Sequence, residues 1–373
     1  MLSESENRRL LSLDAFRGMT IVGMILVNSP GTYRAVYSQL RHAKWNGWTF
    51  ADTIFPFFLF IMGVSIVFSF AGRKQSGLAN SRLDLQIVKR TLILFVLGLF
   101  MNSYPIFHLS TIRIPGVLQR IALCYFFTFL IVRKCGPRGQ IYWLFGLLAS
   151  YWLMMGFVPV PGIGAGLLEP GNNLAAYVDS LLLEGHMWGQ FGTQDPEGIV
   201  STIPAIGTTL FGVLTGNWLR SALSGWRKTA GMICAGTVLL VLGMALDHWL
   251  PINKNIWTST FSIFMAGLAL LALAVIYWLI DVVGYKRWAT VFVIFGKNAI
   301  AIYFLSEILD TSLRFVLRHA SGSTINLRAY LFRSIFTPLA SPENASLLFA
   351  LSYVFLMFLI AWMMWKMKLF VKV

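Results

Sequence analysis

The sequence predicts an all-α fold, in which a polytopic bundle of helices is embedded in a membrane. Of the 373 residues, 57% are hydrophobic and 12% are charged, whereas soluble domains carry about 25% charged residues. Apolar runs of about 20 residues, enough to cross a hydrocarbon core of roughly 30 Å as a helix, recur along the whole chain. We predict about ten transmembrane helices in a single domain over residues 1–373, at residues 10–30, 48–70, 88–104, 115–133, 141–158, 199–219, 229–248, 257–280, 288–306 and 345–366.

The first apolar run is predicted to stay in the protein as a helix rather than to be cleaved as a signal peptide. It is too long for a signal sequence and carries Asp14 and Arg17 near its start. No small-residue cleavage site follows it. We therefore count it as the first transmembrane helix.

The distribution of basic residues predicts that both termini are cytoplasmic. With the N-terminus inside, most of the 30 Lys and Arg fall in segments that this topology places on the cytoplasmic side, where such residues are retained. The long outer loop, residues 159–198, contains neither Lys nor Arg. Membrane orientation thus explains the net charge of +15, and we expect membrane lipid rather than nucleic acid as a partner. Cytoplasmic arginines could in addition bind a phosphorylated donor.

Several common kinds of site have no support in the sequence. The three cysteines fall in two predicted helices and an inner loop, so we expect no external disulfide. The five histidines are scattered, without the Cys/His spacing of a zinc site or an HExxH motif, so we predict no metal. The chain also lacks a phosphate loop, a GxGxxG motif after a strand and a GxSxG motif.

Polar side chains within or beside the apolar runs are the strongest functional signal, because each is costly inside a membrane. By the predicted topology, several of them lie in the outer third of the membrane. These are Asn28, His42, Asp52, Arg120 and Glu307. Arg113 and Gln119 open the fourth span, and Asn298 belongs to the ninth.

His42 and Asp52 are the best candidates for catalysis. They are ten residues apart, so they cannot share a helix face, but a loop that folds back over the second span would bring them together. A carboxylate bound to one ring nitrogen would fix the tautomer and leave the other nitrogen as a general base or acyl acceptor. A loop histidine can equally be a solvated residue without function, and both interpretations remain open at this point.

Asp14 and Arg17 have a structural and a functional interpretation. Their spacing of three places them on one helix face as a local ion pair. The alternative is that Arg17, with Gly18 beside it, binds a phosphate that arrives from the cytoplasm. We expect the ion pair and keep Arg17 as a candidate binding residue.

The chain resembles the heparan-α-glucosaminide N-acetyltransferase family and its bacterial relatives of the NagX type, within the membrane-embedded acyltransferases. The resemblance runs in order from residue 13 to about residue 307. It is carried by LDAFRG at 13–18, VN at 27–28, HAKWNG at 42–47, AD at 51–52, FPFFLFIMG at 55–63, RIPGVLQR at 113–120, VPVPG at 158–162, DPEG at 195–198 and PINKNIW at 251–257, with Gly296, Asn298 and Glu307.

This resemblance implies transfer of an acetyl group from cytoplasmic acetyl-CoA to the amino group of a glucosamine on the outer face. It places the active histidine at His42, its partner acid at Asp52 and a site asparagine at Asn28. His42 acts either as general base or as acetyl carrier, and Asn28 or Arg120 is the candidate donor to the thioester oxygen. The candidate substrate- and cofactor-binding residues are Arg17, Arg113, Gln119, Arg120, Asn298 and Glu307.

The sequence also departs from the lysosomal members that it resembles. Those members carry an additional luminal region before the first helix, and here only a short segment precedes it. We therefore expect a bacterial inner-membrane enzyme that acts on free glucosamine, a small amino sugar or a glycan end. A homodimer is a reasonable expectation for this architecture. The main alternative is a secondary transporter of an amino sugar, although no internal repeat is visible.

The segment at about 307–344 is predicted to form an amphipathic helix on the outer surface. It is rich in arginine, and the sequence suggests no role for these side chains. They are Arg314, Arg318, Arg328 and Arg333.

Overall fold

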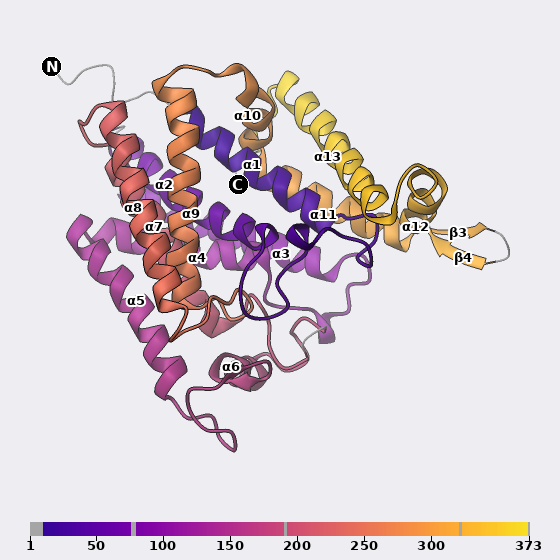
Figure 1. Cartoon of the computed structure of the whole chain (residues 1–373), viewed down its shortest axis with the longest axis horizontal. Helices are drawn as coiled ribbons and strands as arrows, with labels where there is room; N and C mark the ends of the chain where they lie inside the picture. Colours follow the sequence, from indigo (N-terminus) through magenta and orange to yellow (C-terminus); the bar gives the residue numbers. More distant parts are fainter. Residues whose placement is uncertain (1–9, 76–79, 190–191, 321–322, 372–373) are drawn as a thin grey trace.

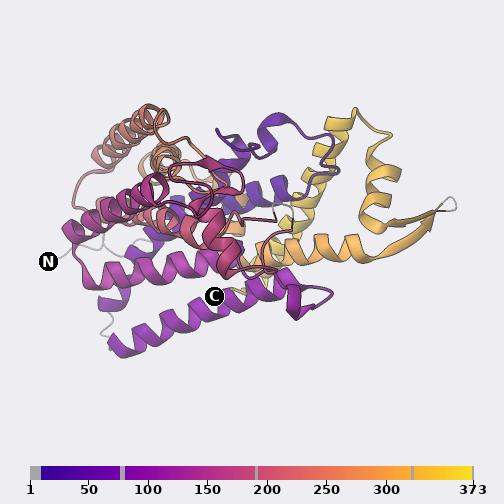
Figure 2. The ribbon, with the colours of Figure 1, turned by 90° about the horizontal axis from the view of Figure 1, so that it is seen from below.

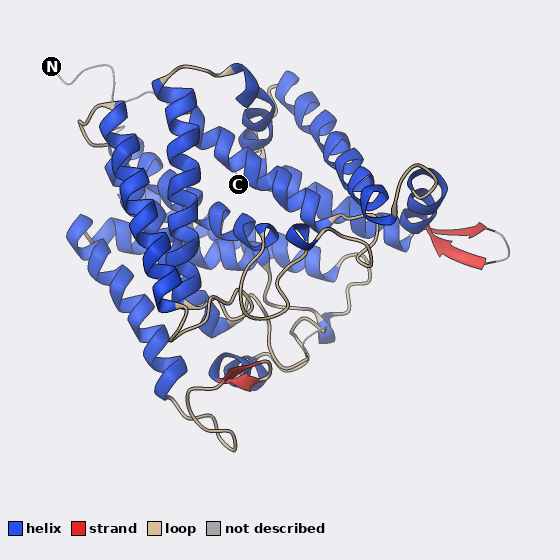
Figure 3. Cartoon of the chain, in the orientation of Figure 1, coloured by secondary structure: helices blue, strands red, loops and turns tan. Residues whose placement is uncertain are grey.

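A computed structural model of the chain describes residues 10–75, 80–189, 192–320 and 323–371. Within these ranges the chain is a bundle of long helices with two small antiparallel sheets, so the predicted all-α class is confirmed (Figure 3). The α-helices are α1 (Leu11–Asn28), α2 (Phe50–Gln75), α3 (Asn80–Ser103), α4 (Val117–Lys134), α5 (Pro137–Phe157), α6 (Leu174–Leu182), α7 (Ile199–Leu219), α8 (Gly225–Leu246), α9 (Ser259–Tyr277), α10 (Thr290–Lys297), α11 (Ala299–Phe315), α12 (Leu327–Leu331) and α13 (Pro342–Lys366).

The strands, the 3₁₀ turns and the π-helical turns are all short. The strands are β1 (Leu168–Glu169), β2 (Asn172–Asn173), β3 (Leu317–Ala320) and β4 (Ser323–Asn326). Strand β1 pairs with β2, and β3 pairs with β4. The 3₁₀ turns are Ser38–Leu40, Leu109–Thr111 and Arg287–Ala289, and the π-helical turns are Trp278–Val282 and Phe332–Phe336.

The structure supports an integral membrane protein, but fewer of its helices are long and apolar enough to cross a membrane than the sequence predicts. In the described residues, six helices are long and apolar enough to cross a membrane, and a seventh span is possible if one bent pair is counted. The six are α1, α2, α7, α8, α9 and α13. Helices α3, α4 and α5 also coincide with predicted spans, but they do not meet this criterion, so the total of ten stays a prediction.

The ninth predicted span, residues 288–306, is wrong as a continuous helix. It is divided into α10 and α11, whose axes differ by 72°. The break lies at Asn298, whose side chain accepts from the backbone N–H of Val371 and donates to the carbonyl of Leu369, both at 2.9 Å. The segment that follows α13 therefore supplies hydrogen-bond partners to the Asn298 side chain at the break. A prediction based on the apolar run alone cannot detect this contact.

Close contacts between helices occur where glycines face a neighbouring backbone. A Cβ atom on Gly296 of α10 would lie 1.9 Å from the carbonyl oxygen of Asp14 in α1, and one on Gly18 would lie 1.7 Å from that of Phe292. Small residues at such places allow membrane helices to approach closely. Helix α1 is thus held against α10 by a contact that no larger side chain would permit.

The predicted amphipathic helix at about 307–344 is also wrong. This segment contains the end of α11, the β3–β4 hairpin, α12 and a π-helical turn, and the hairpin projects from the bundle (Figure 1). One reason is that Arg328 binds inward. Arg314 and Arg328 both pair with Asp310, and the buried Arg328 also donates to the carbonyls of Pro30 and Gly31.

The connections α1–α2, α3–α4, α5–α7 and α8–α9 gather at one end of the bundle, in the lower centre of Figures 1 and 3. Figure 2 shows the same ribbon from below, that is, from the end at which these connections lie. Their contacts join distant parts of the chain. The Arg113 side chain binds Asp195, the indole of Trp45 donates to the carbonyl of Leu168, and the N–H of Gly47 donates to the carbonyl of Ile252.

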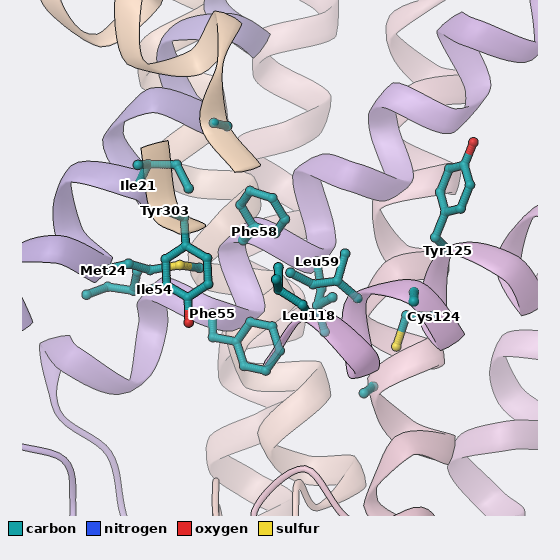
Figure 4. Close-up of a cluster of buried hydrophobic side chains, with 14 of the residues drawn as sticks. Ile21, Met24, Ile54, Phe55, Phe58, Leu59, Leu118, Cys124, Tyr125 and Tyr303 are labelled. Atoms are coloured by element: carbon teal, nitrogen blue, oxygen red, sulfur yellow. The ribbon is translucent and has the colours of Figure 1, made fainter. Parts of the chain in front are cut away.

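An apolar cluster lies inside the bundle, next to these connections (Figure 4). It joins α1, α2, α4 and α11, and Figure 4 shows the ring of Tyr303 among the side chains of α1 and α2. Its members include Ile21, Met24, Ile54, Phe55, Phe58, Leu59, Leu118 and Tyr303. The cluster forms an apolar base for the polar connections.

Candidate active site

Asp52 organises the α1–α2 connection around the start of α2. Thr49 precedes the helix, and its backbone N–H donates to Asp52 Oδ2 at 3.0 Å, which is one half of a capping box. The same oxygen accepts from the N–H of Ala43 at 3.0 Å and from the Thr49 hydroxyl at 3.1 Å. These bonds fold the connection back over α2, as expected from the sequence.

The contact predicted between His42 and Asp52 is present. His42 Nδ1 lies 2.7 Å from Asp52 Oδ1. The Asp52 side chain is 0% exposed, whereas that of His42 is 48% exposed. A fully buried carboxylate can only accept from the imidazole, so we assign the proton to Nδ1, which leaves Nε2 unprotonated. Such a nitrogen can remove a proton or attack a carbonyl.

Lys254, on the connection between α8 and α9, completes this group of side chains. Its Nζ atom lies 3.2 Å from Asp52 Oδ1, and 2.9 Å and 3.3 Å from the two ring nitrogens of His42. The two connections are fastened together beside it, because Gly47 N–H donates to the carbonyl of Ile252 at 2.7 Å. Gly47 has φ +88°, a conformation that favours glycine.

The surroundings of His42 favour its uncharged form. Burial lowers the pKa of His42, and the charge of Lys254 lowers it further, while Asp52 and Glu197 act in the opposite direction. Burial likewise lowers the pKa of Lys254, against the charges of Asp52 and Glu197. Because an imidazole needs a free lone pair to act as base or nucleophile, a lowered pKa extends the pH range in which His42 is competent.

A cavity of about 860 Å³ opens beside His42. Its polar wall includes Asn28, His42, Arg113, Glu197 and Lys254. The apolar part of its lining includes Met24, Ile54, Phe55 and Tyr303, which belong to the cluster in Figure 4. A cavity of this size accommodates a small-molecule ligand, and its one apolar side and one polar side are typical of binding sites.

Arg113 holds together the segment that leads into α7. Its guanidinium binds Asp195 at 2.8 Å and 2.6 Å and Glu197 at 2.5 Å. Asp195 also accepts from the backbone N–H groups of Trp188 and Glu197, at 2.9 Å each. The hydrogen bonds and charge of Arg113 outweigh burial and lower the pKa of Asp195. This network places the Glu197 side chain, which is 11% exposed, in the cavity wall.

Asn28 lies in the cavity wall at the end of α1, and Glu307 lies behind it. Asn28 Nδ2 donates to Glu307 Oε1 at 2.9 Å, and the hydroxyl of Tyr33 donates to the backbone carbonyl of Asn28 at 2.8 Å. Glu307 belongs to α11 and does not line the cavity. It therefore orients the Asn28 amide, whose nitrogen carries a second N–H.

Two of the predicted binding residues lie between helices instead of in the cavity. Arg120 is 1% exposed, and its guanidinium donates to the Gly198 carbonyl and the Ser201 hydroxyl and lies 5.1 Å from the ring of Trp257. Gln119 is buried against Gly98 of α3. Neither lines the cavity, so in this conformation Arg120 does not face the position of a substrate.

Arg17 and Asn298 lie away from the cavity, among the helices α1, α2 and α10. Arg17 binds Asp14 at 3.4 Å, so the predicted ion pair is confirmed, and it also donates to the Ser65 hydroxyl at 2.6 Å and the Gly296 carbonyl at 3.5 Å. Asn298 forms the helix break described above. Their predicted roles in binding remain untested.

Lys254, Glu197 and Tyr303 line the cavity but were not among the residues selected from the sequence. Lys254 and Glu197 lie inside the PINKNIW and DPEG runs, so the motifs marked the right segments. Single charged residues in connecting segments are usually solvated. Only the folded chain brings Lys254 to His42, more than 200 residues away in sequence.

The fold and this site together define an integral membrane protein with a histidine–aspartate–lysine group at the edge of a substrate-sized cavity. Residues 9–252 match the family described as heparan-alpha-glucosaminide N-acetyltransferase, catalytic, and the chain belongs to this family. The match includes His42, Asp52 and Glu197 and ends shortly before Lys254. The family assignment made from the sequence is thus confirmed.

Two relatives from mammals are similar to the chain over about 260 residues each. The chain is 34% identical over 258 residues to heparan-alpha-glucosaminide N-acetyltransferase of Homo sapiens, which covers 57% of this chain and 38% of the human protein. It is 33% identical over 262 residues to the protein of the same name from Mus musculus, covering 58% and 40%. The chain therefore matches well under half of the length of either relative.

Proposed function

We propose that the protein is a transmembrane acetyltransferase, which moves the acetyl group of cytoplasmic acetyl-CoA to the amino group of glucosamine, or of a glycan that contains glucosamine, on the outer face. The observation that carries the proposal is the His42–Asp52 contact of 2.7 Å at the wall of a cavity of about 860 Å³. Membership of the N-acetyltransferase family and the membrane-spanning helices support it.

The orientation follows from the basic residues. Both termini lie on the cytoplasmic side, and the connections that carry His42, Glu197 and Lys254 lie on the outer side. A bacterial inner membrane and a homodimer remain part of the proposal. With this orientation the acceptor reaches the cavity from outside, and the donor must arrive from the opposite face.

The chemistry at His42 can follow two routes. In the first, Nε2 removes a proton from the acceptor amine while the amine attacks the thioester carbon; the C–S bond breaks and the leaving thiolate receives the proton. In the second, Nε2 attacks the thioester carbon and coenzyme A leaves as the thiolate. The amine then attacks the acetyl-imidazole, the C–N bond to His42 breaks, and the amine releases one proton, which balances the proton that the thiolate takes up. In both routes the Asn28 amide is the candidate donor to the developing oxyanion.

The two substrates would meet different parts of the site. The acceptor amine is a cation in solution, and the Glu197 carboxylate in the cavity wall would attract it beside His42. The donor arm must pass the apolar cluster that includes Met24, Ile54 and Phe58. We propose that this cluster opens for the pantetheine arm, and that Arg17 binds the phosphorylated part of the donor on the inner side.

The test is an assay of purified protein in lipid vesicles with radiolabelled acetyl-CoA and glucosamine. His42→Ala should reduce the rate at least ~10³-fold, because the base or nucleophile is removed. His108→Ala is the matched control, since His108 is an exposed residue in another connection, and it should retain the wild-type rate. Equal rates in wild type and His42→Ala would exclude His42 from the reaction.

The same vesicles test the alternative function, a transporter of amino sugars. Uptake of labelled glucosamine without any acetylated product would favour transport. Acetylated product that appears only in the compartment of the acceptor, with label derived from acetyl-CoA on the other side, would favour the acetyltransferase.

A further inference from the structure

His42 meets a physical problem in the proposed reaction. A carboxylate that binds one nitrogen of an imidazole stabilises the imidazolium form and raises the pKa of the ring. The imidazolium has no free lone pair and is neither a base nor a nucleophile. Because Asp52 is fully buried, its charge acts on His42 with little screening by water. Burial of the ring opposes this effect in part, and a positive charge close to the carboxylate would oppose it further.

The geometry points to Lys254. Its Nζ atom lies 3.2 Å from the carboxylate oxygen that His42 binds, and 2.9 Å from the ring nitrogen that faces this oxygen. Its side chain is 15% exposed, and it belongs to a connection that is fastened to the His42 connection through Gly47 and Ile252. Lys254 is therefore a fixed component of the site rather than a mobile surface lysine.

We propose that Lys254 is a positioning residue whose ammonium group donates to Asp52 and, through its charge, keeps the imidazole uncharged. The ammonium neutralises the carboxylate, so that Asp52 still orients Nδ1 but no longer favours protonation of Nε2. The link to acetyl transfer rests on the proposed function, whereas the effect on the protonation of His42 does not.

The other charges around His42 do not replace Lys254. Glu197, on the segment before α7, acts in the same direction as Asp52, and its carboxylate is paired with Arg113 at 2.5 Å. Arg41 and Lys44, on the connection of His42 itself, are exposed, so water screens their charges. Among the charged groups, Asp52 and Lys254 therefore act most directly on the imidazole, and their effects add to that of burial.

The direct test measures the protonation of His42 without either substrate. Diethyl pyrocarbonate modifies only the uncharged imidazole, and mass spectrometry of the peptide that contains His42 gives its extent of modification at each pH. In Lys254→Met the charge is lost while the length of the side chain is kept. We therefore expect the pH at which His42 is modified at half its maximal rate, here called the midpoint, to rise by about one pH unit, so that His42 is modified about tenfold more slowly at pH values below the midpoint. In Lys254→Arg the charge remains, and the midpoint should stay near that of the wild type.

Lys44→Met removes an exposed cation from the same connection and serves as the control, with an unchanged midpoint expected. Should Lys254→Met leave the midpoint of His42 in place or lower it, or should Lys254→Arg shift it as far as Lys254→Met does, the inference is overturned. If Lys254→Met does not fold, as judged by size-exclusion chromatography, Lys254→Gln provides the same comparison.

The acetyl-transfer assay separates this inference from the proposed function. If both hold, the acidic limb of the pH–rate profile moves upward in Lys254→Met, and the activity recovers at higher pH. If the wild type shows no acetyl transfer while the midpoint of His42 still moves, the proposed function fails and the role of Lys254 stands.

Discussion

The two ends of α1 carry polar side chains in different surroundings. At one end, Asn28 lies in the wall of an open cavity with His42 and Lys254. At the other end, Asp14 and Arg17 are bound to each other, and Arg17 also reaches α2 and α10. Polar groups in a membrane need partners in either case, so burial of a charged residue does not by itself identify a site. What distinguishes the two ends is a cavity large enough for a small-molecule ligand.

This comparison predicts that changes at the cavity end affect chemistry, whereas changes at the α1–α10 contact affect stability. The largest effect should come from Asp52→Asn. The amide oxygen would have to take the place of Oδ2, which accepts the N–H groups of Ala43 and Thr49. The NH₂ group would then face His42 Nδ1 and move the ring proton to Nε2.

An imidazole with its proton on Nε2 offers no lone pair to the substrate, so we expect kcat to fall ~10²–10³-fold in Asp52→Asn. Asp84→Asn is the control, because it breaks only a surface ion pair with Arg133, and its kcat should match the wild type. Activity of Asp52→Asn within twofold of the wild type would contradict the comparison.

The next effect is expected from Gly296→Ala at the contact between α1 and α10. The added Cβ would lie 1.9 Å from the carbonyl oxygen of Asp14, so the two helices must separate. Such overpacking costs about 1–3 kcal/mol, and the thermal unfolding temperature should fall. Gly146→Ala in α5 adds a Cβ with no neighbouring atom within 4 Å and should not lower it. Equal thermal unfolding temperatures for Gly296→Ala and Gly146→Ala would show that the contact between α1 and α10 is not tight.

The most local effect is expected from Asn298→Ala. This change removes two hydrogen bonds, to Leu369 and Val371, which together contribute about 1–3 kcal/mol. The segment after α13 should then exchange its amide hydrogens faster, and hydrogen exchange of a peptide that covers residues 367–371 measures this. Unchanged exchange would mean that other contacts hold the segment at the helix break.

The candidate site could be predicted where local sequence decides it. Thr49 and Asp52 form their capping contact within one helical turn, and His42 lies on the same short connection. Arg120 shows the limit of this reasoning, because its position in α4 suggested a group that faces the substrate. Its guanidinium instead binds Gly198 and Ser201 at the start of α7, and the direction of a long side chain depends on which neighbouring helix supplies acceptors.

The sequence by itself determined the membrane class, the approximate positions of most helices and the family. These properties add up along the chain, since transfer of each residue into lipid is a local free energy. The tertiary structure alone decided that α10 and α11 form a bent pair, that Arg328 faces inward to Asp310, and that Lys254 joins His42 and Asp52. These outcomes depend on how distant segments satisfy each other's polar groups, and no local pattern records such pairings.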